Sequence, residues 1–317
     1  MRAAAFLMIA TLPCIATAQT YPHKPIRFVV PFGVGGPGDA IGRMIGRQLT
    51  ERLGQPVVID NRSGATTIIG TELVAKSPPD GHTLLLISTT HAVNPSLFPK
   101  LPYDPIKDFA PVTLITATPF MLGIHPSVAA SSVSELVALA RSKPGALNYG
   151  SSGAGSSIHL TTELLKSAAN LQMTHVPYKG SGPAFIDLIG GQIQMLFSST
   201  VSTMPHVKSG KVRGLAITSL KRASALPEMP TIAESFPGFE SSSWFGLLVP
   251  AKTPQRVMDR LLKETRAALK SPDVNQALVS QGAEPGGSSP TEFGAYFQTE
   301  IGKWAKVIKS AGIKLEQ

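Results

Sequence analysis

The sequence predicts an α/β protein of two lobes, and three observations point to this fold class. Apolar runs alternate with segments of helical spacing, a pattern typical of sheets covered by helices. The alternation stops in a proline-rich, irregular stretch at 94–111 and restarts after Pro126. The chain has 317 residues, which at roughly 150 residues per domain is the length of two domains.

The first half shows regular strand and helix alternation. We expect strands at 26–31, 57–60 and 83–88, and helices at 40–53 and 68–76. Two strand-like runs, 112–116 and 120–125, follow the proline-rich stretch. Because helices separate the strands, we expect largely parallel sheets.

The second half repeats the alternation and ends in helices. It begins with a helix at 134–142, a strand at 147–150 and a helix at 158–169, and further segments of the same kind follow at 173–178, 184–189, 193–197 and 214–218. A loop is expected at 226–243 and a strand at 244–249. Three final helices begin near Pro254, Pro272 and Pro290.

The final helices need a surface to pack on, which predicts a discontinuous first lobe. The segments 120–125 and 244–249 are then the two crossings between lobes, and paired crossings form a hinge. The expected first lobe comprises residues 19–122 and 243–317, and the second comprises residues 123–242. A cleft between the lobes is the expected place for a ligand.

The first eighteen residues have the form of a secretory signal peptide. They carry one basic residue, Arg2, then an apolar core and small residues that end in Ala16-Thr17-Ala18. The single cysteine, Cys14, lies inside this segment, so no disulfide is expected in the mature protein. No later segment is long and apolar enough to span a bilayer. We therefore expect an exported, soluble protein.

The mature chain remains basic. Removing the signal lowers the formal charge from +9 to +8, because Arg2 is its only charged residue. A basic protein suits an acidic small partner, although a generally basic exported protein has the same balance. Nucleic acid is disfavoured, since lysines and arginines are scattered and aromatic residues make up only 6% of the chain.

Two glycine- and serine-rich turns have the build of anion-binding loops. PFGVGGPGD at 31–39 and GSSGAGSSIHL at 150–160 each lie between an apolar run and an amphipathic helical run. Glycine lets backbone amides converge, and the first turn of the following helix offers unpaired N–H groups and partial positive charge. Because the turns fall in different halves, the sequence predicts a carboxylate or phosphate held from both sides.

Four blocks along essentially the whole mature chain resemble one known family: PFGVGGPGD, YGSSGAGSSIHL, THVPYKGSGPAFIDLIGGQIQMLF and PTIAESFPGFESSSWFGLLVPAKTP. They are similar to blocks of the periplasmic solute receptors of tripartite tricarboxylate transporters, the Bug-type or TctC-like receptors. The resemblance implies a type II periplasmic-binding-protein fold whose two lobes close on a small carboxylate. We expect a periplasmic monomer without cofactor that delivers its ligand to membrane permease subunits or to a sensor protein.

The resemblance places the first-lobe site at Phe32 through Asp39. Backbone amides around Gly35 and Gly36 are expected to face the ligand, and a tight turn capped by Asp39 is the structural alternative. Three hydroxyl residues at a strand's carboxyl end either contact the ligand or satisfy local backbone, namely Ser88, Thr89 and Thr90.

The serine-rich turn of the second lobe offers amides and hydroxyls to one carboxylate, and such charge-assisted bonds are strong. The expected contacts there are Ser151, Ser152, Gly153, Ser156 and Ser157. His159 matches a histidine common in the family and is either a ligand contact or a structural hydrogen-bonding residue. Tyr178 and Lys179 open a later loop, where Lys179 either neutralises the anion or is solvated.

One departure from the family pattern concerns the chemistry of the ligand. Many members carry an aspartate directly after the Phe of the MLF strand, suited to an amino group, but here that residue is Ser198. A hydroxyl does not pair with an ammonium as a carboxylate does, so we expect a di- or tricarboxylate, hydroxy acid or aromatic carboxylate without a free amine. Gly38 stands where a hydroxyl residue is frequent, which is expected to widen the first-lobe pocket.

Two enzyme classes compete with this interpretation. Gly33, Gly35 and Gly38 spell GxGxxG and Asp60 ends the next strand, as in an NAD-dependent oxidoreductase. Pro37 inside the turn, the export signal and the second anion-binding loop count against that reading. A secreted hydrolase is disfavoured because the serine-rich turn lacks the GxSxG elbow, and the seven histidines form no HxH or HxxxH pair. We expect neither catalysis nor a metal.

Overall fold

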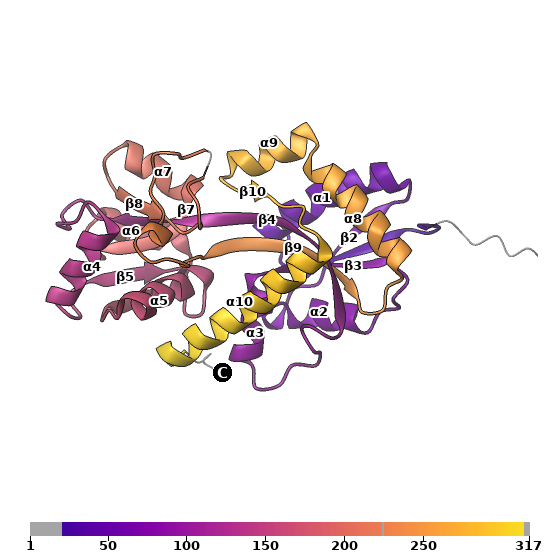
Figure 1. Ribbon diagram of the computed structural model, residues 1–317, viewed down its shortest axis with the longest axis horizontal. Helices are drawn as coiled ribbons and strands as arrows, with labels where there is room; N and C mark the ends of the chain where they lie inside the picture. The colour runs from indigo at the N-terminus through magenta and orange to yellow at the C-terminus, as the bar shows by residue number, and fades with distance from the viewer. Residues whose placement is uncertain (1–20, 224, 314–317) are drawn as a thin grey trace, which may run out of the picture.

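The computed structural model describes residues 21–223 and 225–313, which form two lobes. In Figure 1 the lobes lie at left and right, and β4 (Phe109–Ile124) and β9 (Ser242–Pro250) run between them. The expected signal peptide lies outside the described residues. Within the described part, no helix combines the length and apolar character needed to cross a membrane.

The first lobe, at right in Figure 1, is a mixed sheet with helices on both faces. The strand order is β2-β1-β3-β9-β4, in which β1 (Ile26–Val30), β2 (Val57–Asn61) and β3 (Thr83–Ser88) are parallel and β9 is antiparallel to its neighbours. Short β10 (Glu284–Pro285) pairs with β4. The helices are α1 (Pro37–Leu53), α2 (Ile68–Ala75), α3 (Thr89–Leu97), α8 (Gln255–Leu269), α9 (Pro272–Ser280) and α10 (Pro290–Ala311), with the short turn η1 (Ala65–Thr67) before α2.

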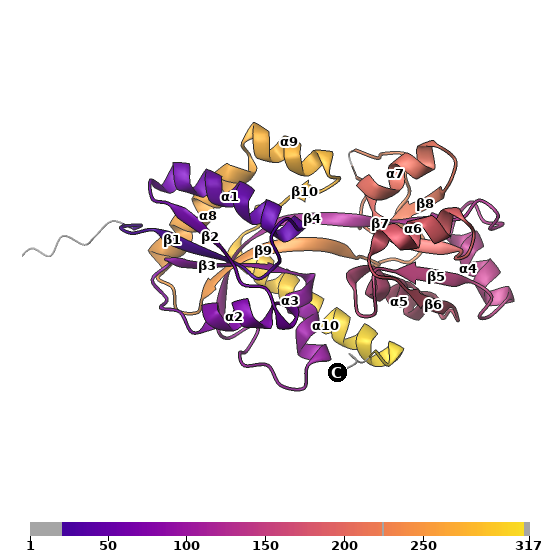
Figure 2. The same ribbon diagram turned by 180° about the vertical axis from the view of Figure 1, so that it is seen from behind.

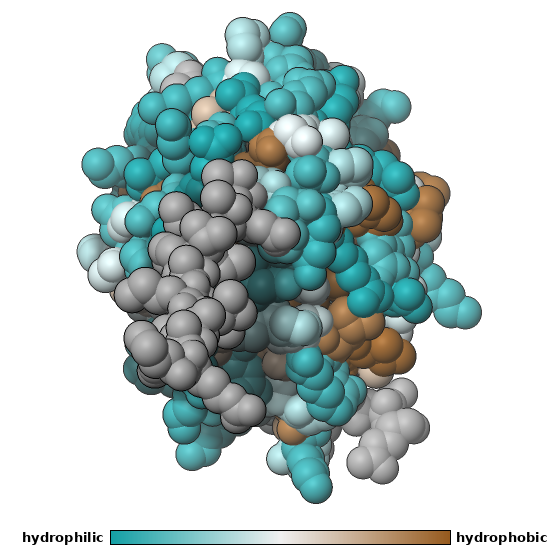
Figure 3. Space-filling view, turned by 90° about the vertical axis from the view of Figure 1, so that its right-hand side faces the viewer, coloured by the Kyte–Doolittle hydropathy of each residue, from teal (hydrophilic) through white to brown (hydrophobic). Residues whose placement is uncertain are grey.

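Two hydrophobic cores lie on the two faces of this sheet, because side chains alternate along a strand. Phe28 and Val30 of β1 belong to the core under α1 and α8, while Val29 belongs to the core under α2, α3 and α10. Figure 2 shows α1 and α8 on one side of the sheet and α2, α3 and α10 on the other. The outer end of this lobe is largely hydrophilic, with hydrophobic residues gathered along one side (Figure 3).

The second lobe has its own core, and its strands continue the sheet of the first lobe through β4. Here β5 (Asn148–Ser151) is parallel to β6 (Thr174–Pro177) and β7 (Met195–Ser199), whereas β4 is antiparallel to β7 and to β8 (Arg213–Ile217). The helices are α4 (Val133–Ser142), α5 (Ser157–Ala169), α6 (Ser181–Ile189) and α7 (Thr200–Lys208), with the short turn η2 (Ile232–Glu234). All buried members of this core fall between Phe120 and Phe239.

Strand β4 passes from one lobe to the other without a break. It pairs with β9 as far as Pro119 and with β7 and β8 from Phe120 onward. The return path lies beside it, because Ser242 pairs with Pro119 and the Ser241 amide donates to the Thr218 carbonyl. Two strands therefore connect the lobes at one place in the molecule.

Several expectations about elements are wrong. The sheets are mixed rather than largely parallel, because both connecting strands run antiparallel to their neighbours. The run 112–116 and residues 120–124 of the second run belong to one strand, β4. Helix α3 occupies the start of the stretch that looked irregular, and α7 was not expected at all. Each of these helices contains a proline, Pro95 or Pro205, which masked its helical pattern.

Candidate functional site

Two adjoining cavities lie between the lobes. The first, of about 370 Å³, is lined by α3, by residues 152–157 before and at the start of α5, and by β9. The second, of about 360 Å³, is lined by the first turns of α1 and α5, by β4 and by the β7–α7 junction. Four residues line both cavities, so together these form one elongated cleft: Ser152, Ser157, Ser243 and Phe245.

The lining of this cleft carries no formal charge. Among the described residues, the side chains around both cavities are apolar, hydroxyl or amide groups, and none is Lys, Arg, His, Asp or Glu. Apolar residues such as Leu160, Ile158 and Phe245 lie between the hydroxyl groups. An anion held here would be bound by neutral donors and helix N-termini rather than by an ion pair.

The hydroxyl groups of the cleft divide into two sets. Those of the first set make no hydrogen bond with other described residues and are free to bind a ligand: Thr66, Thr90, Thr118, Ser152, Ser157, Ser181, Ser198 and Ser243. Those of the second set are used by the protein. Ser88 accepts from the Thr90 amide at 3.3 Å, and Thr89 donates to the Ser242 carbonyl at 3.3 Å.

In the second lobe, the hydroxyls of Ser151 and Ser156 are also used by the protein. The Ser156 hydroxyl caps α5 by accepting the His159 amide at 3.4 Å. The Ser151 hydroxyl lies 3.0 Å from the Gly153 carbonyl and accepts the Gly153 amide at 3.1 Å. Ser156 and Gly153 still line the first cavity, whereas Ser151 does not. These two serines shape the loop that presents Ser152 and Ser157.

The first-lobe turn is organised around Asp39. Its carboxylate accepts from the Gly35 backbone amide at 2.9 Å, Asn61 Nδ2 at 2.9 Å and Arg43 Nε at 3.0 Å. These hydrogen bonds, that of Arg43 above all, lower the pKa of Asp39 to about 2. The Gly35 amide therefore points to Asp39, and neither Gly35 nor Gly36 lines either of the two cavities of the cleft. The next residue, Pro37, is the first residue of α1 and lines the second cavity.

Phe32 contributes to the cleft indirectly. Its ring packs edge-on against Phe245 with a centroid separation of 5.8 Å, and Phe245 lines both cavities. A Cβ at Gly38 would lie 2.4 Å from the Phe32 ring. The absence of a side chain at Gly38 therefore makes room for Phe32, which corrects the expectation that it widens the ligand pocket.

The GxGxxG sequence has a local explanation in the structure. Gly38 is required by the Phe32 ring, and Gly35 has φ of +83°, in the left-handed region that favours glycine. Asp60, the candidate ribose-binding acid, is hydrogen-bonded to Arg27 at 2.6 Å and to Arg62 at 2.9 Å. The GxGxxG glycines at 35 and 38 are thus explained by the packing and backbone conformation of this turn, and no bound dinucleotide is needed to account for them.

Three further predicted contacts also lie outside the lining of the two cavities. Tyr178 donates its hydroxyl to Asp187 at 2.7 Å, and burial together with this carboxylate raises its pKa to about 12. Lys179 is exposed outside the cleft lining. His159 is buried behind the serine-rich loop, where its Nδ1 accepts the Gly155 amide. Of these three, His159 contacts the serine-rich loop through its side chain, and Tyr178 does so through its backbone amide, which donates to the Ser151 carbonyl at 3.1 Å.

Sequence reasoning missed several lining residues. Ser243 and Phe245 face the cleft while the intervening Trp244 is buried and donates to Glu300, so the two-residue periodicity of β9 was the available signal. Thr66 lines the first cavity with φ of +53°, held by Asn94 Nδ2, which donates to its carbonyl at 2.8 Å. No sequence pattern predicts that a threonine adopts a positive φ.

No group of three or more potential metal-ligating side chains lies together among the residues that the structure describes. The structure thus combines two α/β lobes, two connecting strands and an uncharged cleft lined by two helix N-termini. This arrangement defines the class of two-lobed solute-binding receptors.

The comparisons with known proteins give the family. Residues 41–313 match the model of the TctC family, described as the tripartite tricarboxylate transporter family receptor, and the chain belongs to this family. Its members are periplasmic solute-binding receptors, which are not enzymes. The protein BugT of Bordetella pertussis is 37% identical over 314 residues, which cover 98% of this chain and 96% of BugT.

Solved structures agree with this assignment. The R. palustris protein Rpa4515, solved with adipate, is 40% identical, has a TM-score of 0.74 and matches over 93% of this chain and all of its own. MatC of Rhodopseudomonas palustris, solved with bound malate, is 34% identical, has a TM-score of 0.70 and matches over 91% of this chain and all of its own. The predicted type II periplasmic-binding-protein fold of a Bug-type receptor is confirmed.

Proposed function

We propose that the protein is a periplasmic receptor that binds one small carboxylate between its lobes and presents it to the permease subunits of a tripartite tricarboxylate transporter. The observation that carries the proposal is the elongated cleft, whose lining is uncharged and rich in free hydroxyls. In this proposal residues 19–122 and 243–317 move as one lobe and 123–242 as the other. A sensor protein is the alternative partner for the closed receptor.

The two helix N-termini suggest how the anion is held. Pro37 and Ser157 are the first residues of α1 and α5, and both line the second cavity. First-turn amides lack intrahelical partners and carry partial positive charge, so both helices favour an anion between them. The carboxylate docks on the serine-rich loop of the second lobe, and closure then brings the α1 turn over it, replacing bulk water with fixed dipoles.

Ser198 supports a ligand that lacks a free amine. It lies at the end of β7, is 3% exposed and lines the second cavity, where no carboxylate is present among the described residues. An ammonium placed there would lose hydration without gaining an ion pair. Adipate and malate, with which the two similar proteins were solved, are both dicarboxylates without an amine.

Matched pairs of ligands test this class directly by isothermal titration calorimetry. Aspartate carries an amine where malate carries a hydroxyl, and 2-aminoadipate differs from adipate only by its amine. We expect each amine-free acid that binds to do so at least about tenfold more tightly than its amino partner. Binding of the amino acids alone would overturn the proposal.

A variant extends the same test to Ser198. Ser198→Asp introduces a carboxylate beside the ligand, and we expect it to weaken the amine-free acids and strengthen the amino acids. Ser198→Asn has a similar shape without the charge and should not favour the amino acids. An unchanged preference in Ser198→Asp would show that this position does not face the part of the ligand that carries the amine.

A further inference from the structure

We propose that His159 is a positioning residue for ligand binding, whose unprotonated Nδ1 holds the Gly155 amide and thereby fixes the serine-rich loop, residues 151–157. The inference rests on the proposed function, because the shape of this loop affects binding only if the cleft takes up an anion. His159 itself lines neither cavity and acts through the loop.

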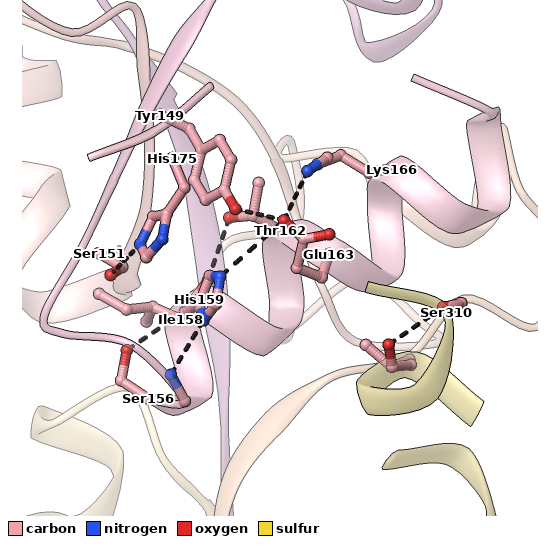
Figure 4. A network of polar contacts seen from close by, with 12 residues as sticks. Tyr149, Ser151, Ser156, Ile158, His159, Thr162, Glu163, Lys166, His175 and Ser310 are labelled. Carbon is pink, nitrogen blue, oxygen red and sulfur yellow. Dashed lines mark hydrogen bonds and ion pairs between the residues drawn. The ribbon is translucent and has the colours of Figure 1, made fainter. Parts of the chain in front are cut away.

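The hydrogen bond sets the protonation of the ring. The Gly155 amide donates to His159 Nδ1 at 2.9 Å. Figure 4 shows His159 between Ser156 and Glu163. A backbone N–H is only a donor, so Nδ1 must keep its lone pair, and the proton of the neutral ring must lie on Nε2. That nitrogen faces Glu163, with 3.9 Å between Nε2 and Oε1. A proton on Nδ1 would break the contact with the loop.

The surroundings keep the ring neutral. His175 of β6 stacks on His159 with a centroid separation of 3.9 Å and an interplanar angle of 9°. From β5 the Tyr149 hydroxyl bonds to Glu163, and Lys166 lies 2.6 Å from the same carboxylate on α5. Burial, and next the neighbouring His175, lower the pKa of His159 to about 4. The acceptor is therefore present throughout the neutral range of pH.

The two stacked imidazoles hold opposite ends of the loop. His175 Nε2 lies 2.6 Å from the Ser151 hydroxyl at its start, and His159 holds Gly155 near its end. Between these anchors, Gly153 and Gly155 have φ of +131° and +74°, so the backbone depends on glycine and on the anchors for its course. The hydroxyl partner of His175 can donate or accept, whereas the amide partner of His159 can only donate. His159 alone must be unprotonated at the nitrogen that faces the loop.

Two amide side chains make a matched pair of variants. In His159→Asn, Oδ1 takes the place of Nδ1 and can accept the Gly155 amide, whereas the amide of His159→Gln reaches one methylene too far. With adipate as the probe, we expect calorimetry to show about tenfold weaker binding for His159→Gln and His159→Ala, and affinity within about threefold of the parent for His159→Asn. Equal affinities in all four proteins, or no rescue by asparagine, would overturn the inference.

A readout without ligand separates this inference from the proposed function. In ¹⁵N-imidazole NMR spectra, His159 Nδ1 should remain unprotonated from pH 8 down to pH 5. Exchange of the Gly155 amide with solvent should be slow in the parent and in His159→Asn, and faster in His159→Gln. Titration of His159 near its ordinary pKa, or equal exchange in all variants, would contradict the inference. Failure of every carboxylate to bind the parent protein would contradict the proposed function alone.

Discussion

At the scale of single residues, Ser156 and Ser157 show how neighbouring serines take different roles. The Ser156 hydroxyl caps α5, and the Ser157 hydroxyl makes no bond with another described residue while it lines both cavities. The sequence predicted that both serines contact the ligand. It could not separate them, because the difference depends on the exact residue at which α5 begins. The residue before the first turn caps the helix with its hydroxyl, and the next residue does not.

Ser157→Ala should weaken binding without destabilising the protein. The change removes one donor and leaves no protein group unpaired, so we expect about tenfold weaker binding of adipate and an unchanged free energy of unfolding. Ser156→Ala is the matched control, and it should lower the free energy of unfolding by about 1 kcal/mol through loss of the helix cap. Calorimetry and urea unfolding measure the two effects. Full affinity in Ser157→Ala would contradict its assignment as a ligand donor.

At the scale of elements, the sequence predicted the helices whose starts carry a signal. Expected starts near Pro254, Pro272 and Pro290 agree with α8, α9 and α10, and the last of these begins with a capping box of Ser289 and Glu292. The serine-rich loop before α5, which the sequence predicted to bind the ligand, lines the first cavity. The cleft side of β9 was not predicted, because which faces of two lobes meet is decided by the assembled fold rather than by local periodicity.

The turn between β1 and α1 offers an element-scale prediction. Gly38→Ala places a methyl group against the Phe32 ring and should lower the free energy of unfolding by about 1–3 kcal/mol. Because Phe32 packs on Phe245, adipate binding should weaken as well. Gly33→Ala is the control, since no atom lies within 4 Å of the added Cβ, and both properties should stay near those of the parent. Equal stability of the two variants, measured in urea, would rule out this account of the turn.

At the scale of the whole molecule, three cores and two connecting strands define where a ligand can lie. Two cores cover the faces of the first-lobe sheet, and the third fills the second lobe. The uncharged cleft between the lobes remains open to a ligand. The lobes also meet beside this space, where a Cβ at Gly282 would lie 2.1 Å from Thr200 Oγ1. The sequence predicted two lobes joined by two crossings. The crossing expected at 120–125 overlaps the end of β4, which is one continuous strand from Phe109 to Ile124.

The most direct test of the central claim is a crystal structure of the protein with bound adipate. We expect one carboxylate between the lobes, within hydrogen-bonding distance of the Ser152 and Ser157 hydroxyls and of first-turn amides of α5, with no charged side chain in contact. Adipate bound outside the cleft, or held there by a lysine or arginine, would contradict the account.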